Sequence, residues 1–164
     1  MWQRSGFYNR EIDVLASVEL LERYIRLVQS NYPTFSKEEL ELKPAPNKWS
    51  RKEVLGHLID SAINNLKRFT EIQFHTGTYS NQAYNQNELV VVNHYQELPL
   101  QHLINLWSSL NRQIVYVITH VGAEKFELKV NPQYEDQQVR TFGWLFCDYV
   151  AHMEHHLKLI LPLD

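Results

Sequence analysis

The hydrophobic positions along the chain repeat at the spacing of amphipathic helices in four segments. Each segment is about 20 residues long and carries apolar residues three or four positions apart, which is the period of a helix with one buried face. The segments are 11–30, 51–74, 99–121 and 141–161. Four amphipathic helices of similar length predict an all-α four-helix bundle, and we expect one domain over residues 1–164.

The second segment has the clearest helix start in the sequence. Ser50 and Glu53 stand three residues apart, so that each side chain can bind the other's backbone N–H in a capping box. Trp49 and Val54 occupy the positions of a hydrophobic staple. A second capping box, over residues 36–39, predicts a short helical turn before this helix.

Two connections between the predicted helices are long, residues 75–98 and 123–140. A connection of this length in a small domain typically forms a functional lid or crosses between helices that are not antiparallel neighbours. Within the second connection, residues 126–130 alternate between apolar and polar side chains. This alternation predicts one arm of a short hairpin before the last helix.

Composition excludes several classes of protein. Apolar residues make up 44% of the 164 residues, which is too many for a disordered chain. A net charge of -3 disfavours binding to nucleic acid through its phosphates. The single cysteine, Cys147, allows neither an internal disulfide nor a thiolate zinc site. With no run of about 18 apolar residues, the sequence predicts a soluble cytoplasmic protein without a membrane partner.

Three histidines form the candidate functional residues. His152 and His156 are four residues apart on the last predicted helix, so both imidazoles project from one face. His57 lies on the second predicted helix and begins a polar row that continues through Ser61, Asn64 and Arg68. Two simpler interpretations remain open, because paired histidines are often ordinary core residues and a polar row is often a solvated helix face.

Three neutral imidazoles suit a catalytic metal ion better than a structural one. They leave the full charge of a divalent cation to polarise a further ligand, and they leave a coordination position open. Zinc and nickel fit best, with iron, manganese and copper as alternatives. Asp60, Asp148 and Asn64 are candidates to orient the imidazole rings, or the two acids could bind the ion. The competing interpretation is that Asp60 and Asp148 are ordinary solvated acids on a helix face.

Other catalytic patterns fit less well. A zincin motif needs Glu directly after the first histidine, but Met153 follows His152. The sequence has neither a nucleophile elbow nor a glycine-rich phosphate loop. Cys147 lies on the last predicted helix, where we expect buried filler rather than a nucleophile.

These motifs together resemble the DinB/YfiT-like superfamily. The similarity rests on Lys-Trp-Ser-x-x-Glu-Val-Leu-Gly-His-Leu-Ile-Asp over residues 48–60, on Thr-Phe-Gly-Trp over 141–144, and on the histidines of 152–156. The resemblance covers all four predicted helices. It implies a bundle with an up-down-down-up crossover topology, and a divalent metal ion held by His57, His152 and His156.

The resemblance also implies several activities. Characterised relatives include S-transferases that use bacillithiol or mycothiol and a thiol-dependent isomerase, while YfiT-type members have been called metal-dependent hydrolases. We therefore expect a metal site that activates a low-molecular-weight thiol against an electrophile. The alternatives are hydrolysis by metal-bound hydroxide, and a non-catalytic metal-binding or dimerisation bundle, which Tyr84 or Tyr95 closing the cleft would favour. We also expect a homodimer.

Overall fold

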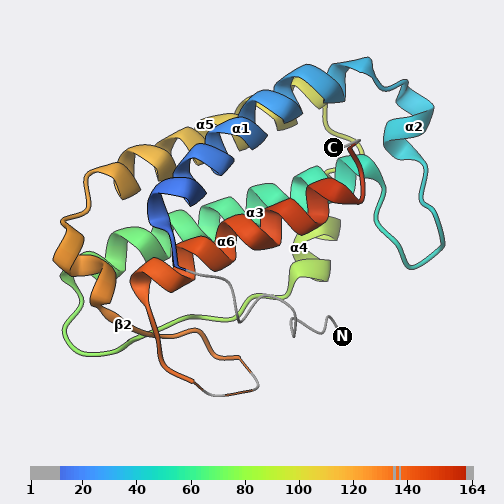
Figure 1. Cartoon of the computed structure of the whole chain (residues 1–164). Helices are drawn as coiled ribbons and strands as arrows, with labels where there is room; N and C mark the ends of the chain where they lie inside the picture. Colours follow the sequence, from blue (N-terminus) through green and yellow to red (C-terminus); the bar gives the residue numbers. More distant parts are fainter. Residues whose placement is uncertain (1–11, 135, 137, 162–164) are drawn as a thin grey trace.

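Four long helices form a bundle in the computed structural model, which describes residues 12–134, 136 and 138–161. The helices are α1 (Val14–Asn31), α3 (Arg51–Glu71), α5 (Leu100–Thr119) and α6 (Phe142–Lys158) (Figure 1). Helices α1 and α3 each pack against both α5 and α6. The predicted all-α four-helix bundle is confirmed, although α6 ends before the predicted Leu161. No described helix has both the length and the apolarity to cross a membrane.

The bundle has the crossover topology that the family resemblance implied. Helices α3 and α5 run in the same direction, whereas α1 and α6 run the opposite way (Figure 1). The connection from α3 to α5 must therefore return along the length of the bundle. It contains strand β1 (Tyr79–Ser80) and the short helix α4 (Gln86–Val92), which the sequence pattern did not predict. Helix α4 begins where the Asn85 side chain accepts a hydrogen bond from the backbone N–H of Glu88.

The remaining elements are short. They are α2 (Lys37–Glu41), the 3-10 helices η1 (Tyr32–Thr34), η2 (Ile72–Phe74) and η3 (Ala123–Glu127), and the strands β2 (Lys129–Asn131) and β3 (Arg140–Thr141). Strand β2 pairs antiparallel with β3, which confirms the hairpin before the last helix, and it pairs parallel with β1. The first arm starts at Lys129 rather than at residue 126, because residues 123–127 form η3.

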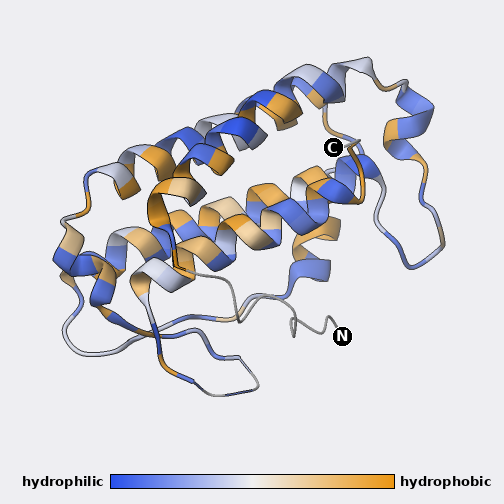
Figure 2. Cartoon of the chain, in the orientation of Figure 1, coloured by the Kyte–Doolittle hydropathy of each residue, from blue (hydrophilic) through white to orange (hydrophobic). Residues whose placement is uncertain are grey.

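The core lies between the inward faces of the four helices. Each long helix has an apolar side and a polar side (Figure 2), and the apolar side is buried. Phe69 of α3 forms ring contacts with Phe142, Phe146 and Tyr149 of α6, with ring centroids 5.7 to 5.8 Å apart. Such aromatic pairs contribute about 0.5–1.5 kcal/mol each beyond the area they bury. These contacts hold α3 against α6.

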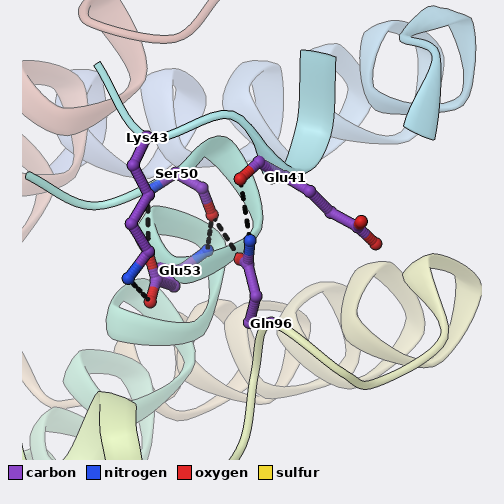
Figure 3. A network of polar contacts seen from close by, with 5 residues as sticks. All are labelled: Glu41, Lys43, Ser50, Glu53 and Gln96. Carbon is purple, nitrogen blue, oxygen red and sulfur yellow. Dashed lines mark hydrogen bonds and ion pairs between the residues drawn. The ribbon is translucent and has the colours of Figure 1, made fainter. Parts of the chain in front are cut away.

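The start of α3 is fixed by a network of polar contacts (Figure 3). The backbone N–H of Glu53 donates to Ser50 Oγ at 3.2 Å, and the Ser50 N–H donates to Glu53 Oε2 at 2.9 Å, so the predicted capping box is confirmed. Ser50 Oγ also donates to Gln96 Oε1 at 2.6 Å, and the Gln96 amide donates to the carbonyl of Glu41 at 2.8 Å. Lys43 donates to Glu53 Oε1 at 2.6 Å. The network joins α2, α3 and the segment before α5.

Candidate metal centre

The three predicted histidines meet between α3 and α6. His57 comes from the second turn of α3, and His152 and His156 come from the C-terminal half of α6. The Nε2 atom of His152 lies 3.4 Å from Nε2 of His57 and 3.1 Å from Nε2 of His156. One ring nitrogen from each of the three residues lies within 4.8 Å of the other two. The fold therefore brings together residues that are 95 positions apart in the sequence.

These distances suit a single metal ion. Nitrogen ligands bind zinc at about 2.0–2.1 Å, so two of them at corners of a tetrahedron lie about 3.3 Å apart. The two short Nε2 separations are close to this value. The donor set has three neutral nitrogens and no described thiolate, which matches sites that keep a coordination position open. A divalent cation fits this cluster, and its ligands would be the three histidines.

Trp49 packs against two of the three histidines. His57 is fully buried and His156 is 7% exposed. The Trp49 ring lies 4.7 Å from the His57 ring and 6.3 Å from the His156 ring, centroid to centroid. Sequence reasoning assigned Trp49 to a hydrophobic staple and missed this role. The sequence does contain a clue to this contact, because Trp49 directly precedes Ser50, the N-cap residue of the helix that carries His57.

The cluster also borders a cavity of about 190 Å³. His152 lines this cavity, whereas His57 and His156 do not. The walls come from α3, α6, residues 81–84 of the crossover connection, Gln86 at the start of α4, and residues 132–134 of the hairpin loop. Both long connections therefore contribute to the site, as their length suggested. A cavity of this size has room for several water molecules or a small organic ligand.

Tyr84 and Tyr95 do not close this cavity. Tyr84 is part of its wall. Tyr95 packs against Gly56, where a built Cβ atom would lie 2.2 Å from the Tyr95 ring, so only glycine fits there. The group that approaches the α3 backbone at Gly56 is therefore the Tyr95 ring.

Asp60 is buried beside this contact. Its Oδ1 accepts hydrogen bonds from Tyr95 Oη at 2.6 Å and from the Asn93 amide at 3.0 Å. Burial raises the pKa of Asp60 above its usual value, and the two hydrogen bonds lower it in part. The structure thus gives Asp60 partners on the segment after α4, and its predicted role in orienting an imidazole stays a prediction.

The other two predicted supporting residues have contacts of their own. Asp148 lines the cavity, and its Oδ2 accepts a hydrogen bond from Tyr134 Oη at 2.6 Å. Asn64 donates to the carbonyl of Asp60 one turn earlier in α3, at 2.8 Å. The cavity wall contains Asn65 instead of Asn64. The polar row of α3 that faces the cavity is therefore Ser61, Asn65 and Arg68, which replaces the predicted row through Asn64.

Cys147 is not part of the cavity wall. It is partly buried, and its sulfur lies 3.3 Å from Ser17 Oγ, which donates to it. Burial raises the pKa of the Cys147 thiol, and this effect exceeds the lowering by the Ser17 hydrogen bond. These surroundings agree with the expected packing role.

Comparison with known proteins identifies the family. A search of curated proteins found no match. Among solved structures, the chain is similar to YfiT from Bacillus subtilis, described as a probable metal-dependent hydrolase with an unusual four-helix bundle topology. The TM-score is 0.82 at 16% sequence identity, and the match covers 94% of this chain and 90% of YfiT. The family model of the DinB superfamily matches residues 20–160. The chain belongs to the DinB superfamily.

Proposed function

We propose that the protein is a metal-dependent enzyme that activates a low-molecular-weight thiol for transfer to an electrophile. The observation that carries this proposal is the position of the three histidines: they share one buried point, and one of them, His152, borders a polar cavity. A structural metal site would be closed on all sides. A site that adjoins a cavity leaves room for a further ligand.

A divalent cation held by His57, His152 and His156 would lower the pKa of a bound thiol, since neutral ligands leave its charge uncompensated. The protein's own groups then have separate tasks. The histidines hold the ion beside the cavity, and Trp49 packs against the rings of His57 and His156, where it would limit access of water to them. The polar side chains of the cavity bind the remainder of the thiol compound.

The transfer step balances without a redox partner. The thiol gives its proton to water or buffer, and the sulfur lone pair forms a new S–C bond with the electrophile. The leaving group departs with the electron pair of the bond that breaks. Neither an oxidant nor a reductant is needed, and Cys147 takes no part.

Hydrolysis is the second candidate function. It is favoured by the similarity in fold to YfiT, described as a probable metal-dependent hydrolase. In this case a water molecule takes the position of the thiol, and the cavity binds an ester or amide substrate. The two functions differ in one measurable property, because only the transferase requires an added thiol. A non-catalytic metal-binding bundle is the third candidate, and the open cavity beside His152 argues against it.

The first experiment measures metal content by plasma mass spectrometry on the untagged protein, with His57→Ala and His152→Ala beside it. We expect about one divalent ion per chain in the native protein and none in either variant. His102→Ala is the matched control, because His102 is an exposed histidine of α5 outside the cluster. Absence of metal, together with no uptake of zinc or nickel, would refute the proposal.

The second experiment measures turnover of a chromogenic electrophile by the metal-loaded protein with several cellular thiols. A thiol-dependent rate above the reaction of free thiol, absent in His152→Ala, supports the transferase. Turnover of ester substrates without any thiol supports the hydrolase instead. If neither reaction occurs while metal binds, the non-catalytic interpretation is favoured.

A further inference from the structure

We infer that the cavity beside the histidines selects a small molecule that carries a carboxylate and, a few bonds away, an N–H group. This inference rests on the proposed function, since it names the chemical class of the thiol that the same site binds. Arg68 recognises the carboxylate, and Asn81 accepts the hydrogen bond from the N–H group. Neither residue has been assigned a role so far.

The cavity wall is polar, and its charges are few. Five of its residues carry side-chain amides, namely Asn65, Asn81, Gln82, Gln86 and Gln133. Its charged residues are one arginine and one aspartate, Arg68 and Asp148. Amides bind groups that both donate and accept hydrogen bonds. Such a wall suits a ligand with peptide-like groups and a single negative charge better than an apolar ligand or a multiply charged phosphate.

Arg68 is held in place at the wall. Its guanidinium donates to the carbonyl of Gln82 at 2.7 Å and to Asn65 Oδ1 at 3.3 Å, and it lies over the Tyr84 ring at 5.7 Å from the centroid. A guanidinium that is already ordered loses little entropy when it binds an anion. Its planar array of donors matches a carboxylate. Arg68 is therefore the group in the cavity wall that attracts a carboxylate.

Asn81 has an acceptor that the described residues leave unsatisfied. The residue is 7% exposed, and its side-chain Oδ1 is buried without a hydrogen-bond partner in the described part of the chain. Its backbone N–H donates to the Asn131 carbonyl at 3.0 Å, which fixes its position between the crossover connection and the hairpin. A buried acceptor without a donor costs about 1–3 kcal/mol. Asn81 lines the cavity, and a small rotation of its side chain toward the cavity would let an N–H group of a bound ligand satisfy this acceptor.

The distance along α3 between the metal site and Arg68 sets the length of a ligand that reaches both. His57 and Arg68 are 11 residues apart on α3, a rise of about 16 Å at 1.5 Å per residue. His152 of the antiparallel helix α6 lies at the histidine end of this span, 3.4 Å from His57 between their Nε2 atoms, and both His152 and Arg68 line the cavity. Allowing for the length of the arginine side chain, the ligand reaches from the metal site to Arg68 with roughly the span of a short peptide. A modified amino acid or a two- or three-residue thiol fits.

The experiment compares three thiols by isothermal titration calorimetry on the full-length, zinc-loaded protein. N-acetylcysteinylglycine has both the carboxylate and N–H groups at peptide length, its C-terminal amide lacks the carboxylate, and 6-mercaptohexanoate, with the same number of bonds from sulfur to carboxylate, lacks the N–H groups. We expect N-acetylcysteinylglycine to bind at least about 10-fold more tightly than its amide, since a charge-assisted hydrogen bond contributes about 1.5–3 kcal/mol. Equal affinity of the acid and the amide would overturn the carboxylate assignment.

Variants separate Arg68 and Asn81 from the metal ion. Arg68→Gln should reduce the preference for the acid over the amide to near unity, whereas Arg112→Gln should leave it unchanged. Arg112 is the matched control because it donates to Gln29 of α1 and lines a different groove. Retained preference in Arg68→Gln would show that the carboxylate binds elsewhere, for example on the metal ion. Asn81→Ala should reduce only the preference for N-acetylcysteinylglycine over 6-mercaptohexanoate, and no reduction would overturn its role.

Binding and turnover distinguish the two proposals. Arg68-dependent binding without any thiol-dependent turnover supports the ligand class and contradicts the transferase. Turnover without a preference for the carboxylate supports the transferase and overturns the ligand class. Failure of all three thiols to bind at millimolar concentration overturns the ligand class as well.

Discussion

Cys147 is the one thiol of the chain, and its surroundings keep it protonated at neutral pH. Burial raises its pKa, and only the thiolate form reacts. We expect Cys147 to react with iodoacetamide several-fold more slowly than free cysteine at pH 7, and its reaction rate to rise only at a higher pH than that of free cysteine. Alkylation followed by mass spectrometry measures both rates.

The same residue serves as a control for the proposed chemistry. Cys147→Ala should keep the metal content and the thiol-dependent turnover, because the sulfur that reacts belongs to the substrate. Loss of turnover in a variant that still binds metal would make Cys147 the nucleophile and would contradict the proposal.

Gly56 supports a second prediction for a single residue. A Cβ atom at this position would lie 2.2 Å from the Tyr95 ring, so the ring must move and its hydrogen bond to Asp60 is lost. We expect Gly56→Ala to lower the free energy of unfolding by about 1–3 kcal/mol, despite the better helix propensity of alanine. Urea denaturation measures the change.

Gly143 is the matched control, because it also lies in a helix. A Cβ atom there would have its nearest contacts at 3.4 to 3.5 Å, which is ordinary van der Waals distance. Gly143→Ala should leave the stability unchanged or raise it slightly. Equal destabilisation in both variants would mean that the Tyr95 contact is not the cause at Gly56.

At the scale of the elements, the cap of α3 has two functions. Ser50 Oγ accepts from the backbone N–H of Glu53 and donates to Gln96, and the residue is fully buried. We expect Ser50→Ala to destabilise the protein by about 1–2 kcal/mol, since it removes the cap and leaves Gln96 Oε1 without this donor. Chemical denaturation gives the value, and the metal content should be unchanged.

Ser36→Ala removes a capping box of the same kind at a solvent-exposed position. Ser36 caps the five-residue helix α2 in a capping box with Glu39 at the surface. Its loss should cost less than the loss of Ser50, because solvent replaces the missing hydrogen bonds. A larger effect at Ser36 would contradict the importance given to the buried network around Ser50.

The sequence predicted the four long helices and the pair of His152 and His156 because both follow local rules, whereas His57 was joined to that pair through its polar row and the family resemblance. Apolar spacing, a capping box and an i, i+4 histidine pair depend only on nearby residues. Helix α4 was missed because seven residues ending in Val90, Val91 and Val92 give too short a pattern. Asn64 was chosen over Asn65 because the rotation of α3 relative to α6 depends on contacts such as that of Phe69 with Phe146. The sequence of one helix does not reveal how that helix packs against its neighbours.

At the scale of the whole molecule, the crossover topology determines where the site forms. It makes α3 antiparallel to α6, so that His57, near the start of α3, lies opposite His152 and His156, near the end of α6. The returning connection then passes over the same pair of helices and supplies residues 81–84 to the cavity. A simple up-and-down bundle would have short connections and no such wall.

Because its ligands lie on two helices, a bound metal ion should stabilise the whole fold. At a free metal concentration 100 times the dissociation constant, binding adds about 2.7 kcal/mol to the free energy of unfolding. For a chain of this size, this corresponds to a rise in Tm of roughly 5–10 °C. The rise should diminish in acidic solution, because protonated imidazoles cannot bind metal. Differential scanning calorimetry with zinc and with a chelator measures it.

The variants show whether the ion acts through the cluster. His57→Ala and His152→Ala should still fold, because the core contacts of Phe69 are intact, but they should gain no Tm from zinc. His102→Ala should gain as much as the native protein. If instead His152→Ala loses its helical circular dichroism at room temperature, the ion has a structural role, since the fold would then depend on it. The cavity beside His152 would in that case need another explanation.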